Sequence, residues 1–472
     1  MFFGRKAELE KLNHMYASDK FEFSIVYGRR RVGKTTLIEE FCKGKKTIFF
    51  VSCEADEKIN LENFSHQVYY VLDKKNAGNS FFSSWDKALS YIYEASKTER
   101  IILAMDEYPY LAESYRPISS ILQAHIDHYF QKSKLFLILC GSSMSFMEYQ
   151  VLGYKSPLYG RRTAQFKILP FNFFESLPFL SGFDSKDKAV IYGVTGGTPE
   201  YLKKIDHETS LKENIVNLFL NPSGHFFEEP TNLIKQELRE PSTYNGILKA
   251  IAEGASKLNE ISTKNINMES SKCAKYLRVL IDLGIVKKEF PVTETYSKKS
   301  IYLLDDQMFR FWYRFVFPNM STIVSGFGEQ LYDNEVEPKL SHFMGIAFEQ
   351  ICKQYFFELL RRNELPFFIG KIGRWWGNDN VKKCEAEIDL MSFRDENALF
   401  AECKWTNEKV NIDVLNTLIY RSKFFKYKNN YFYLFAKSDF TKQCVDKAKE
   451  DLRIKLITFD EIIEQYEQYK PK

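Results

Sequence analysis

A glycine-rich segment constrains the fold of this chain more than any other feature. Residues Gly28 to Thr35 have the sequence GRRRVGKT, which fits the pattern G-x-x-x-x-G-K-[ST]. An apolar run, FEFSIVY, precedes the segment, and a helical stretch begins at about Lys34. Between a strand and a helix, such a loop binds phosphate groups, because its glycines let backbone amides surround an anion at the start of the helix. The segment therefore predicts a phosphate-binding loop, or P-loop, at the edge of a parallel sheet.

The N-terminal part of the chain alternates between short apolar runs and helical stretches. After the first run come TIFFV, RIILAMD and LFLILC. Each run is apolar enough to be covered by helices on both faces, which is typical of strands in a parallel sheet. We therefore predict an α/β fold for this region, with a P-loop parallel sheet over residues 1–170.

The P-loop also predicts a ligand, which is ATP with Mg²⁺. The backbone of the loop would surround the phosphates, Lys34 would reach the β and γ phosphates, and the hydroxyl of Thr35 would bind Mg²⁺. The residues predicted to contact the nucleotide are Gly28, Arg29, Arg30, Arg31, Val32, Gly33, Lys34, Thr35 and Thr36.

Polar residues follow two of the other predicted strands. RIILAMD ends in Asp106 and is followed by Glu107. Downstream of a P-loop, Asp106 is predicted to hold Mg²⁺ and Glu107 to polarise the attacking water. LFLILC is followed by Gly141, Ser142 and Ser143, which lie beside the phosphates in this topology. Ser142 or Ser143 either senses the γ-phosphate or belongs to a simple turn.

Arg161 and Arg162 form an adjacent basic pair with no nearby acidic residue to pair with. One of them could act as an arginine finger that stabilises negative charge in the transition state of ATP hydrolysis. The alternative is a solvated pair on the surface.

Two further segments make a family resemblance specific. FFGRKAE, residues 2–8, is similar to the hhGRExE motif of the signal-transducing STAND class, and Gly197-Thr198-Pro199 matches its G-x-P motif. From residue 1 to about 300, the chain resembles the archaeal-type branch of AAA-superfamily ATPases in this class. The resemblance implies that Arg5 lies near the nucleotide, that the G-x-P motif takes part in nucleotide-linked movement of a helical lid, and that Arg161 or Arg162 acts on the nucleotide.

The middle of the chain predicts a helical region followed by a winged helix-turn-helix. Residues 241–304 contain three helical stretches and then two strand-like runs, IVKKEF and SIYLL. The third helical stretch carries Lys272, Lys275 and Arg278 on one face, together with Tyr276. This face is predicted either to bind DNA or to be the solvated surface of an internal lever.

Acidic and basic residues recur at strand-like spacing near the C-terminus. Asp389 lies in the run EIDL, and Glu402-Cys403-Lys404 lies in the next strand-like run. In a strand, Glu402 and Lys404 share a face while Cys403 points toward the core. A hairpin would bring Asp389 beside them. Two carboxylates can share a divalent cation and an ammonium group can orient water, which suits the hydrolysis of a phosphodiester.

This constellation resembles the PD-(D/E)xK nuclease superfamily over roughly 130 residues. The expected order of elements also agrees: helix, strand, strand, strand, helix, strand, helix. The resemblance implies a restriction-endonuclease-like α/β domain in which Glu349, Asp389 and Glu402 bind Mg²⁺ or Mn²⁺ and Lys404 assists catalysis. Arg374-Trp375-Trp376, just before the hairpin, either contacts nucleic acid or caps the core.

Composition limits the partners and the compartment. The net charge is only +4, so DNA binding would depend on local basic patches. The eight cysteines show no C-x-x-C spacing, which is typical of reduced thiols in the cytoplasm. The apolar runs are much shorter than the roughly 18 residues that a membrane span needs, so no membrane contact is expected.

Together these features predict an ATP-binding and ATP-hydrolysing molecular switch coupled to a metal-dependent DNA nuclease. An alternative is a DNA-binding ATPase regulator whose C-terminal domain is inactive and serves dimerisation, and a third is a scaffold that binds ATP without turnover. DNA is the expected macromolecular partner, and a homo-oligomer is compatible with either enzyme or regulator. The expected parts are a P-loop ATPase core (1–170), a helical lid (171–240), a winged helix (241–304), an aromatic linker (305–338) and a nuclease-like domain (339–472).

Overall fold

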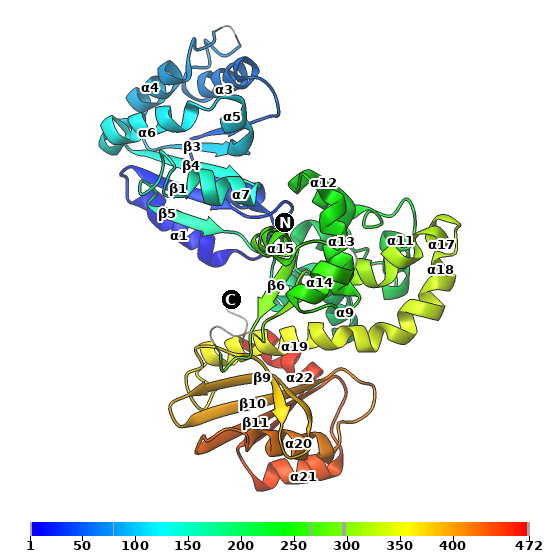
Figure 1. Cartoon of the computed structure of the whole chain (residues 1–472). Coiled ribbons are helices and arrows are strands. Elements are labelled where there is room, and N and C mark those ends of the chain that lie inside the picture. Colours follow the sequence, from blue (N-terminus) through cyan, green and yellow to red (C-terminus); the bar gives the residue numbers. More distant parts are fainter. Residues whose placement is uncertain (1, 79, 265–266, 295–298, 470–472) are drawn as a thin grey trace. The chain divides into compact units, whose positions relative to one another are not determined.

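The chain divides into two compact units. A computed structural model describes residues 2–78, 80–264, 267–294 and 299–469 (Figure 1). Unit 1 comprises Met1–Phe171 and Thr198–Glu200, and unit 2 comprises the remaining residues. Each unit contains its own β-sheet, and the two are described separately.

Unit 1 is built on a sheet of five parallel strands in the order β2-β3-β4-β1-β5. The strands are β1 (Glu22–Tyr27), β2 (Thr47–Val51), β3 (Ile101–Asp106), β4 (Leu135–Gly141) and β5 (Ala164–Lys167). The four predicted strands are confirmed. The edge strand β5 was not predicted, because its sequence AQFK contains two polar residues and no continuous apolar run.

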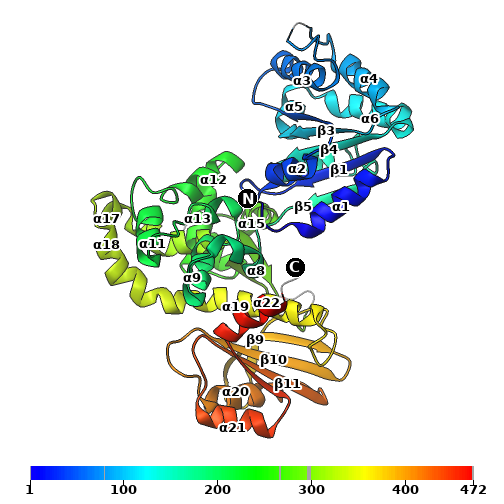
Figure 2. The ribbon, with the colours of Figure 1, turned by 180° about the vertical axis from the view of Figure 1, so that it is seen from behind.

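Helices cover both faces of this sheet (Figures 1 and 2). Side chains of α1 and α2 share one buried cluster with the strands. On β2, Phe49 packs toward this cluster, whereas Phe50 contacts Phe64 of α3 and Trp85 of α4. The helices of unit 1 are α1 (Lys6–Ala17), α2 (Lys34–Cys42), α3 (Glu57–Leu72), α4 (Trp85–Ser96), α5 (Tyr108–Ser114), α6 (Ile118–His128) and α7 (Met144–Phe146), with short turns at Phe130–Lys132 and Met147–Val151.

The first part of unit 2 is helical, as predicted. Its helices are α8 (Phe173–Ser176), α9 (Ser185–Thr195), α10 (Pro199–Leu202), which begins in unit 1, α11 (Leu211–Phe219) and α12 (Glu229–Glu237), with a turn at Leu177–Leu180. Three more helices and an antiparallel pair of strands follow: α13 (Pro241–Ala252), α14 (Leu258–Lys264), α15 (Ser270–Asp282), β6 (Val286–Glu289) and β7 (Ile301–Leu304). The three helices and two strands lie where the sequence predicted them.

Residues 305–338 do not behave as a linker. They form α16 (Gln307–Phe311), α17 (Met320–Val324) and α18 (Gly328–Leu331), together with π-helical segments at Trp312–Val316 and Tyr332–Val336 and a 3-10 helix at Phe317–Asn319. Phe311 and Trp312 are buried, and the indole N–H of Trp312 donates a hydrogen bond to the carbonyl of Phe227 over 2.7 Å. Aromatic side chains at this density need to be buried, and here they form part of the core of unit 2. Our expectation of a linker was therefore wrong, because these aromatic residues belong to a folded core.

The C-terminal part contains a second sheet of five strands, in the order β12-β11-β10-β9-β8. β9 pairs antiparallel with both β8 and β10, whereas β10, β11 and β12 are parallel. The elements are α19 (Glu337–Arg361), β8 (Gly373–Asp379), β9 (Cys384–Arg394), β10 (Asn397–Lys404), α20 (Ile412–Ser422), β11 (Asn429–Ala436), α21 (Lys442–Glu450), β12 (Ile454–Thr458) and α22 (Phe459–Tyr469). The order from α19 to α21 is the predicted one, and β12 and α22 extend it.

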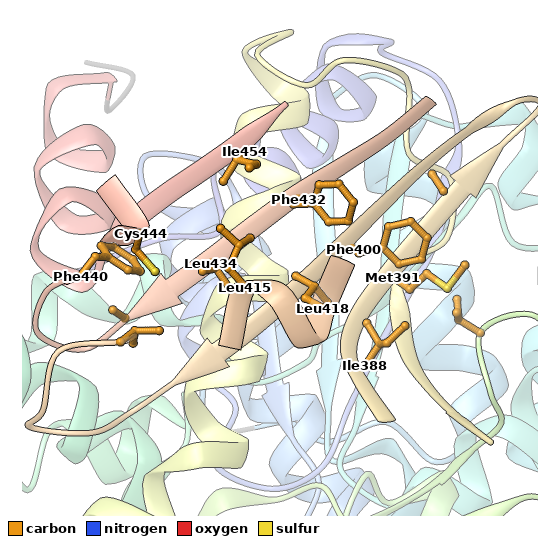
Figure 3. Close-up of a cluster of buried hydrophobic side chains, with 14 residues drawn as sticks. Ile388, Met391, Phe400, Leu415, Leu418, Phe432, Leu434, Phe440, Cys444 and Ile454 are labelled. Atoms are coloured by element: carbon orange, nitrogen blue, oxygen red, sulfur yellow. The ribbon is translucent and has the colours of Figure 1, made fainter. Parts of the chain in front are cut away.

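Both faces of the second sheet carry a core. Leu415 and Leu418 of α20 and Cys444 of α21 pack against strand residues such as Phe400 and Leu434 (Figure 3). Other aromatic side chains of the sheet contact α19, where Phe356 packs edge-on against Phe435. Among the described helices, each falls short of the length or the apolarity that a membrane crossing requires.

Candidate functional site

The P-loop connects β1 to α2, and two glycines determine its shape. A Cβ atom at Gly28 would lie 2.2 Å from the carbonyl oxygen of Ile168, so no side chain fits there. Gly33, immediately before α2, has a φ of 88°, a conformation that other residues rarely adopt. The loop can therefore pass close to its neighbours and turn sharply into the helix. The amides in the first turn of an α-helix have no partner within the helix, so those of α2 can face an anion.

Lys34 lies within the loop. Its side chain is only 5% exposed, and Nζ donates a hydrogen bond to the carbonyl of Arg29 over 3.0 Å. Among the described residues, no carboxylate accepts a hydrogen bond from Nζ of Lys34. A buried ammonium group of this kind is costly unless an anion can approach it. This position at the start of α2 suits contact with phosphate groups.

Thr35 and Asp106, the two predicted Mg²⁺ ligands, lie side by side. The hydroxyl of Thr35 donates to Oδ2 of Asp106 over 2.6 Å, and Oδ1 accepts the amide of Glu107 over 2.9 Å. A hydroxyl and a carboxylate are oxygen ligands of the kind that Mg²⁺ prefers. These residues fit the ion that a P-loop nucleotide requires.

Glu107 is held at the end of β3 by Ser142, at the end of β4. Oε2 of Glu107 accepts hydrogen bonds from the hydroxyl of Ser142, at 2.8 Å, and from its amide, at 3.3 Å. Glu107 has a φ of 48°, which is uncommon for a non-glycine residue and is typical of functional positions. Of the two serines considered for nucleotide sensing, Ser142 is thus the one in contact with the predicted catalytic carboxylate.

Residues distant in sequence surround the P-loop within unit 1. The guanidinium of Arg5 donates to the carbonyls of Val32 and Leu169 and lies over the ring of Phe171. Arg29 donates to the hydroxyl of Thr198 over 2.7 Å. The N-terminal motif and the G-x-P motif therefore both reach the loop.

The remaining loop residues have separate environments. Arg30 donates to the hydroxyl of Tyr110 over 2.8 Å, and Arg31 has a φ of 71°. Val32 is buried beneath the loop, whereas Thr36 is exposed on the first turn of α2. Their predicted contacts with nucleotide remain predictions.

Arg161 and Arg162 lie at the other end of the sheet. They precede β5, and the next residue, Thr163, donates its amide to the carbonyl of Phe23 near the start of β1. Arg161 makes two hydrogen bonds to Asp127, of 2.7 and 2.6 Å, so the expectation that the pair lacks an acidic partner was wrong for this residue. The P-loop follows the opposite end of β1. A role of either arginine in hydrolysis stays a prediction.

In the second sheet, the hairpin of β9 and β10 brings Asp389, Glu402 and Lys404 together as predicted. Oδ2 of Asp389 accepts the amide of Cys403 over 2.8 Å. Nζ of Lys404 donates to Oε1 of Glu402 over 2.7 Å and lies 4.0 Å from Oδ2 of Asp389. Cys403 is buried on the other face of β10.

Glu402 has an unusual environment for a carboxylate. It is 7% exposed, and its Oε2 has no hydrogen-bond partner among the described residues. Burial raises the pKa of Glu402 to about 7, and the negative charge of Asp389 adds to this effect, whereas Lys404 opposes it. A buried carboxylate oxygen without a partner next to a second carboxylate fits a divalent cation.

Glu349, the third predicted metal ligand, is engaged elsewhere. Its Oε2 accepts a hydrogen bond from Nη2 of Arg374 over 2.5 Å. Burial raises the pKa of Glu349, and Arg374 opposes this while the charge of Asp389 adds to it. Among the described residues, no group of three or more His, Cys, Asp or Glu side chains is arranged to hold a metal ion. The predicted three-carboxylate set is therefore incomplete in this conformation.

Comparison with known proteins identifies the N-terminal part. The family described as an ATPase domain predominantly from Archaea matches residues 2–205. The uncharacterized protein MJECL04 of Methanocaldococcus jannaschii is 33% identical over 419 residues, which cover 87% of this chain and 88% of that protein. The chain belongs to the same family as this archaeal protein. Its N-terminal part is an archaeal-type P-loop ATPase domain.

Further matches agree with this assignment of the ATPase. A solved structure, the Walker-type ATPase PABY2304 of Pyrococcus abyssi, aligns with a TM-score of 0.50 at 18% identity, over 66% of this chain and 96% of that one, and shows a shared fold. The uncharacterized ATP-binding protein MJ0423 of M. jannaschii is 52% identical over 46 residues, covering 10% of this chain and 78% of that protein. Residues 312–415 of the ATPase match a family described as archaeal and bacterial proteins of unknown function.

The sequence did not identify two residues near Glu402. Arg421 of α20 lies 3.9 Å from Oε2 of Glu402 and donates to the carbonyl of Glu387 over 2.6 Å. Glu387 precedes Asp389 by two positions on β9, so strand periodicity could have placed it near the site. No local pattern marks Arg421, because its helix approaches the site only in the folded sheet.

The predicted basic face of α15 is exposed. Lys272, Lys275 and Arg278 point away from the buried residues of that helix, Cys273, Leu277 and Leu280. Tyr276 is not free on this face, because its hydroxyl donates to Glu240 and its ring packs against Tyr244.

Proposed function

We propose that this ATPase is a molecular switch whose nucleotide state regulates a metal-dependent DNA nuclease site in residues 339–472. The observation that carries the nuclease half is the convergence of Asp389, Glu402 and Lys404, with a buried oxygen on Glu402 that accepts no hydrogen bond from the described residues. A charged strand surface with no function would leave these groups in water rather than bury one of them at a cost in stability.

At the ATPase site, each residue has a distinct task. Lys34 and the loop amides bind the β and γ phosphates, and Thr35 and Asp106 hold Mg²⁺, which neutralises phosphate charge. Glu107 accepts a proton from the attacking water, and Ser142 orients its carboxylate. The hydrogen bond between Arg29 and Thr198 couples the conformation of the P-loop to the helical lid of residues 171–240.

At the nuclease site, Asp389 and Glu402 hold Mg²⁺ or Mn²⁺. The ion supplies a Lewis acid for the scissile phosphate. The amide of Cys403 fixes the orientation of the Asp389 carboxylate, and Lys404 orients the water that attacks the phosphodiester. Burial and the charge of Asp389 raise the pKa of Glu402 to about 7, so a cation held by this carboxylate would compete with a proton at neutral pH.

DNA is the proposed substrate, and residues 241–304 form a proposed winged helix. The exposed residues Lys272, Lys275 and Arg278 suit contact with phosphates. A homo-oligomer would allow Arg161 or Arg162 of one copy to reach the nucleotide of another.

The ion pair between Glu349 and Arg374 supports a second candidate function. If Arg374 holds Glu349 permanently, the C-terminal domain is an inactive dimerisation module and the protein is a DNA-binding ATPase regulator.

Cleavage of DNA separates the two candidates. The purified full chain is incubated with plasmid, linear and single-stranded DNA, with and without ATP, in Mg²⁺ or Mn²⁺. We expect the wild type to cleave DNA in a metal-dependent way, and Asp389→Ala, Glu402→Ala and Lys404→Ala to abolish this cleavage. Glu385→Ala, at an exposed position on β9, should retain it. Cleavage by the double variant Asp389→Ala with Glu402→Ala would contradict the proposal.

A further inference from the structure

Arg374 of β8 joins two acidic residues beside the proposed nuclease site. Its Nη2 lies 2.5 Å from Oε2 of Glu349 on α19, and its Nε lies 3.0 Å from Oε1 of Glu387 on β9. The Arg374 side chain is 17% exposed. The pair with Glu349, which is 20% exposed, is shielded from solvent, whereas Glu387 is 49% exposed. Salt screens an ion pair less when both of its groups are partly buried.

An irregularity in the sheet places Arg374 level with Asp389. The register pairs Gly373 with Met391 and Trp375 with Ile388, so Arg374 alone lies opposite Asp389 and Leu390. Such bulges redirect side chains at functional sites. The irregular register of β8 and β9 therefore places the guanidinium among the acidic residues.

The segment after β6 contacts β8 at this same residue. The amide of Val292 donates to the carbonyl of Arg374 over 2.9 Å, and the Val292 side chain is 2% exposed within the core that contains Ile388 and Met391. Nζ of Lys371 donates to the carbonyls of Val292 and Glu294, at 3.1 and 3.3 Å. The proposed wing is thus attached to the strand that carries Arg374.

The charge of Arg374 also extends to the wing. Burial alone would raise the pKa of Glu289 on β6, but Lys287 and then Arg374 lower it. Arg374 is therefore stabilised by acidic groups from α19, β9 and β6.

We propose that Arg374 is a tethered counter-cation. Its positive charge neutralises Glu349 and Glu387, and so keeps Glu349 from joining Asp389 and Glu402 around a divalent cation. The segment 289–294 holds Arg374 in this position. The inference rests on the proposed function and names a regulation of that site. Movement of the wing relative to β8 would release Glu349, which adds one carboxylate ligand and removes one positive charge from the vicinity of the ion. Both changes strengthen metal binding.

Mn²⁺ binding to the full chain, measured by calorimetry and electron paramagnetic resonance, tests the counter-cation. We expect Arg374→Gln to bind Mn²⁺ about tenfold more tightly than the wild type, because a competing charge is removed. Arg374→Lys keeps the charge and should stay close to the wild type. The gain should disappear in Arg374→Gln combined with Glu349→Gln. Binding by Arg374→Gln that is no tighter than the wild type, or a gain that survives loss of Glu349, would overturn the inference.

Lys371→Ala tests the tether at an exposed position, where the fold should tolerate the change. We expect it to tighten Mn²⁺ binding by a smaller factor in the wild-type background and by none in the Arg374→Gln background. An unchanged affinity in Lys371→Ala overturns the part assigned to the wing. If Arg374→Gln does not fold, tighter Mn²⁺ binding by Lys371→Ala supports the inference, and an unchanged affinity overturns it.

The outcomes also separate this inference from the proposed nuclease. Mn²⁺ binding that is lost in Glu402→Ala but unaffected by Arg374→Gln overturns the counter-cation and leaves the metal site. Tighter binding in Arg374→Gln without any DNA cleavage supports the counter-cation and overturns the nuclease. Absence of Mn²⁺ binding in all variants overturns both.

Discussion

The hydroxyl of Ser142 donates a hydrogen bond to Oε2 of Glu107 over 2.8 Å, and so links the ends of β4 and β3. If Glu107 is the general base, Glu107→Gln should bind ATP normally and hydrolyse it at least about 100-fold more slowly. Ser142→Ala should lower the turnover number with little change in ATP affinity. Binding of a fluorescent ATP analogue and release of phosphate measure the two quantities. Equal losses of binding and turnover would instead make Glu107 a structural residue.

Lys34→Ala should abolish ATP hydrolysis and weaken nucleotide binding, because the cation next to the β and γ phosphates is removed. Lys43→Ala is a suitable control, because Lys43 is an exposed residue just after the same helix. Steady-state phosphate release and nucleotide titration measure both effects. Undiminished turnover in Lys34→Ala would refute the P-loop assignment.

Glu402→Gln should stabilise unit 2 at pH 8. The pKa of Glu402 is about 7 in the folded chain and about 4.5 for an ordinary glutamate, so folding favours the protonated form. Stability is therefore lost as pH rises from about 4.5 to 7, and the variant avoids this loss. We expect a gain of roughly 3 kcal/mol at pH 8 and none below about pH 4.5.

Tryptophan fluorescence during urea unfolding can follow this effect, because most of the tryptophans lie in unit 2: Trp312, Trp375, Trp376 and Trp405. Glu385→Gln, at an exposed position of the neighbouring strand β9, should change stability little at either pH. A variant that is equally stable, or less stable, at pH 8 would show that burial of Glu402 is not costly.

Neutralising Lys272, Lys275 and Arg278 together should weaken DNA binding and reduce the slope of log affinity against log salt by roughly two to three, since each phosphate contact contributes close to one. The exposed lysines of α21, Lys442, Lys447 and Lys449, provide a control of similar charge. Fluorescence anisotropy over a range of salt concentrations gives the slopes. An unchanged slope would favour an internal lever over a DNA-binding helix.

The sequence alone was sufficient for the local parts of both sites. Strand β1, the P-loop and the start of α2 are adjacent in the chain, so the sequence of one continuous segment is enough to predict their local structure. The same holds for Glu402 and Lys404, which share a face because side chains alternate along any strand. The proximity of Asp389 could also be expected, since antiparallel neighbours β9 and β10 are joined by a short turn.

The tertiary structure decided which distant groups meet. Asp127 neutralises Arg161, Ser142 contacts Glu107, and Arg374 binds the Glu349 that the sequence assigned to a metal. Edge strand β5 and the buried aromatic residues within 308–316 likewise depend on the surfaces that they pack against rather than on their own periodicity. Hydrophobic pattern and backbone preference act over a few residues, and they specify elements. The pairing of charges acts through space, and only the packed fold brings together residues separated by tens to hundreds of positions.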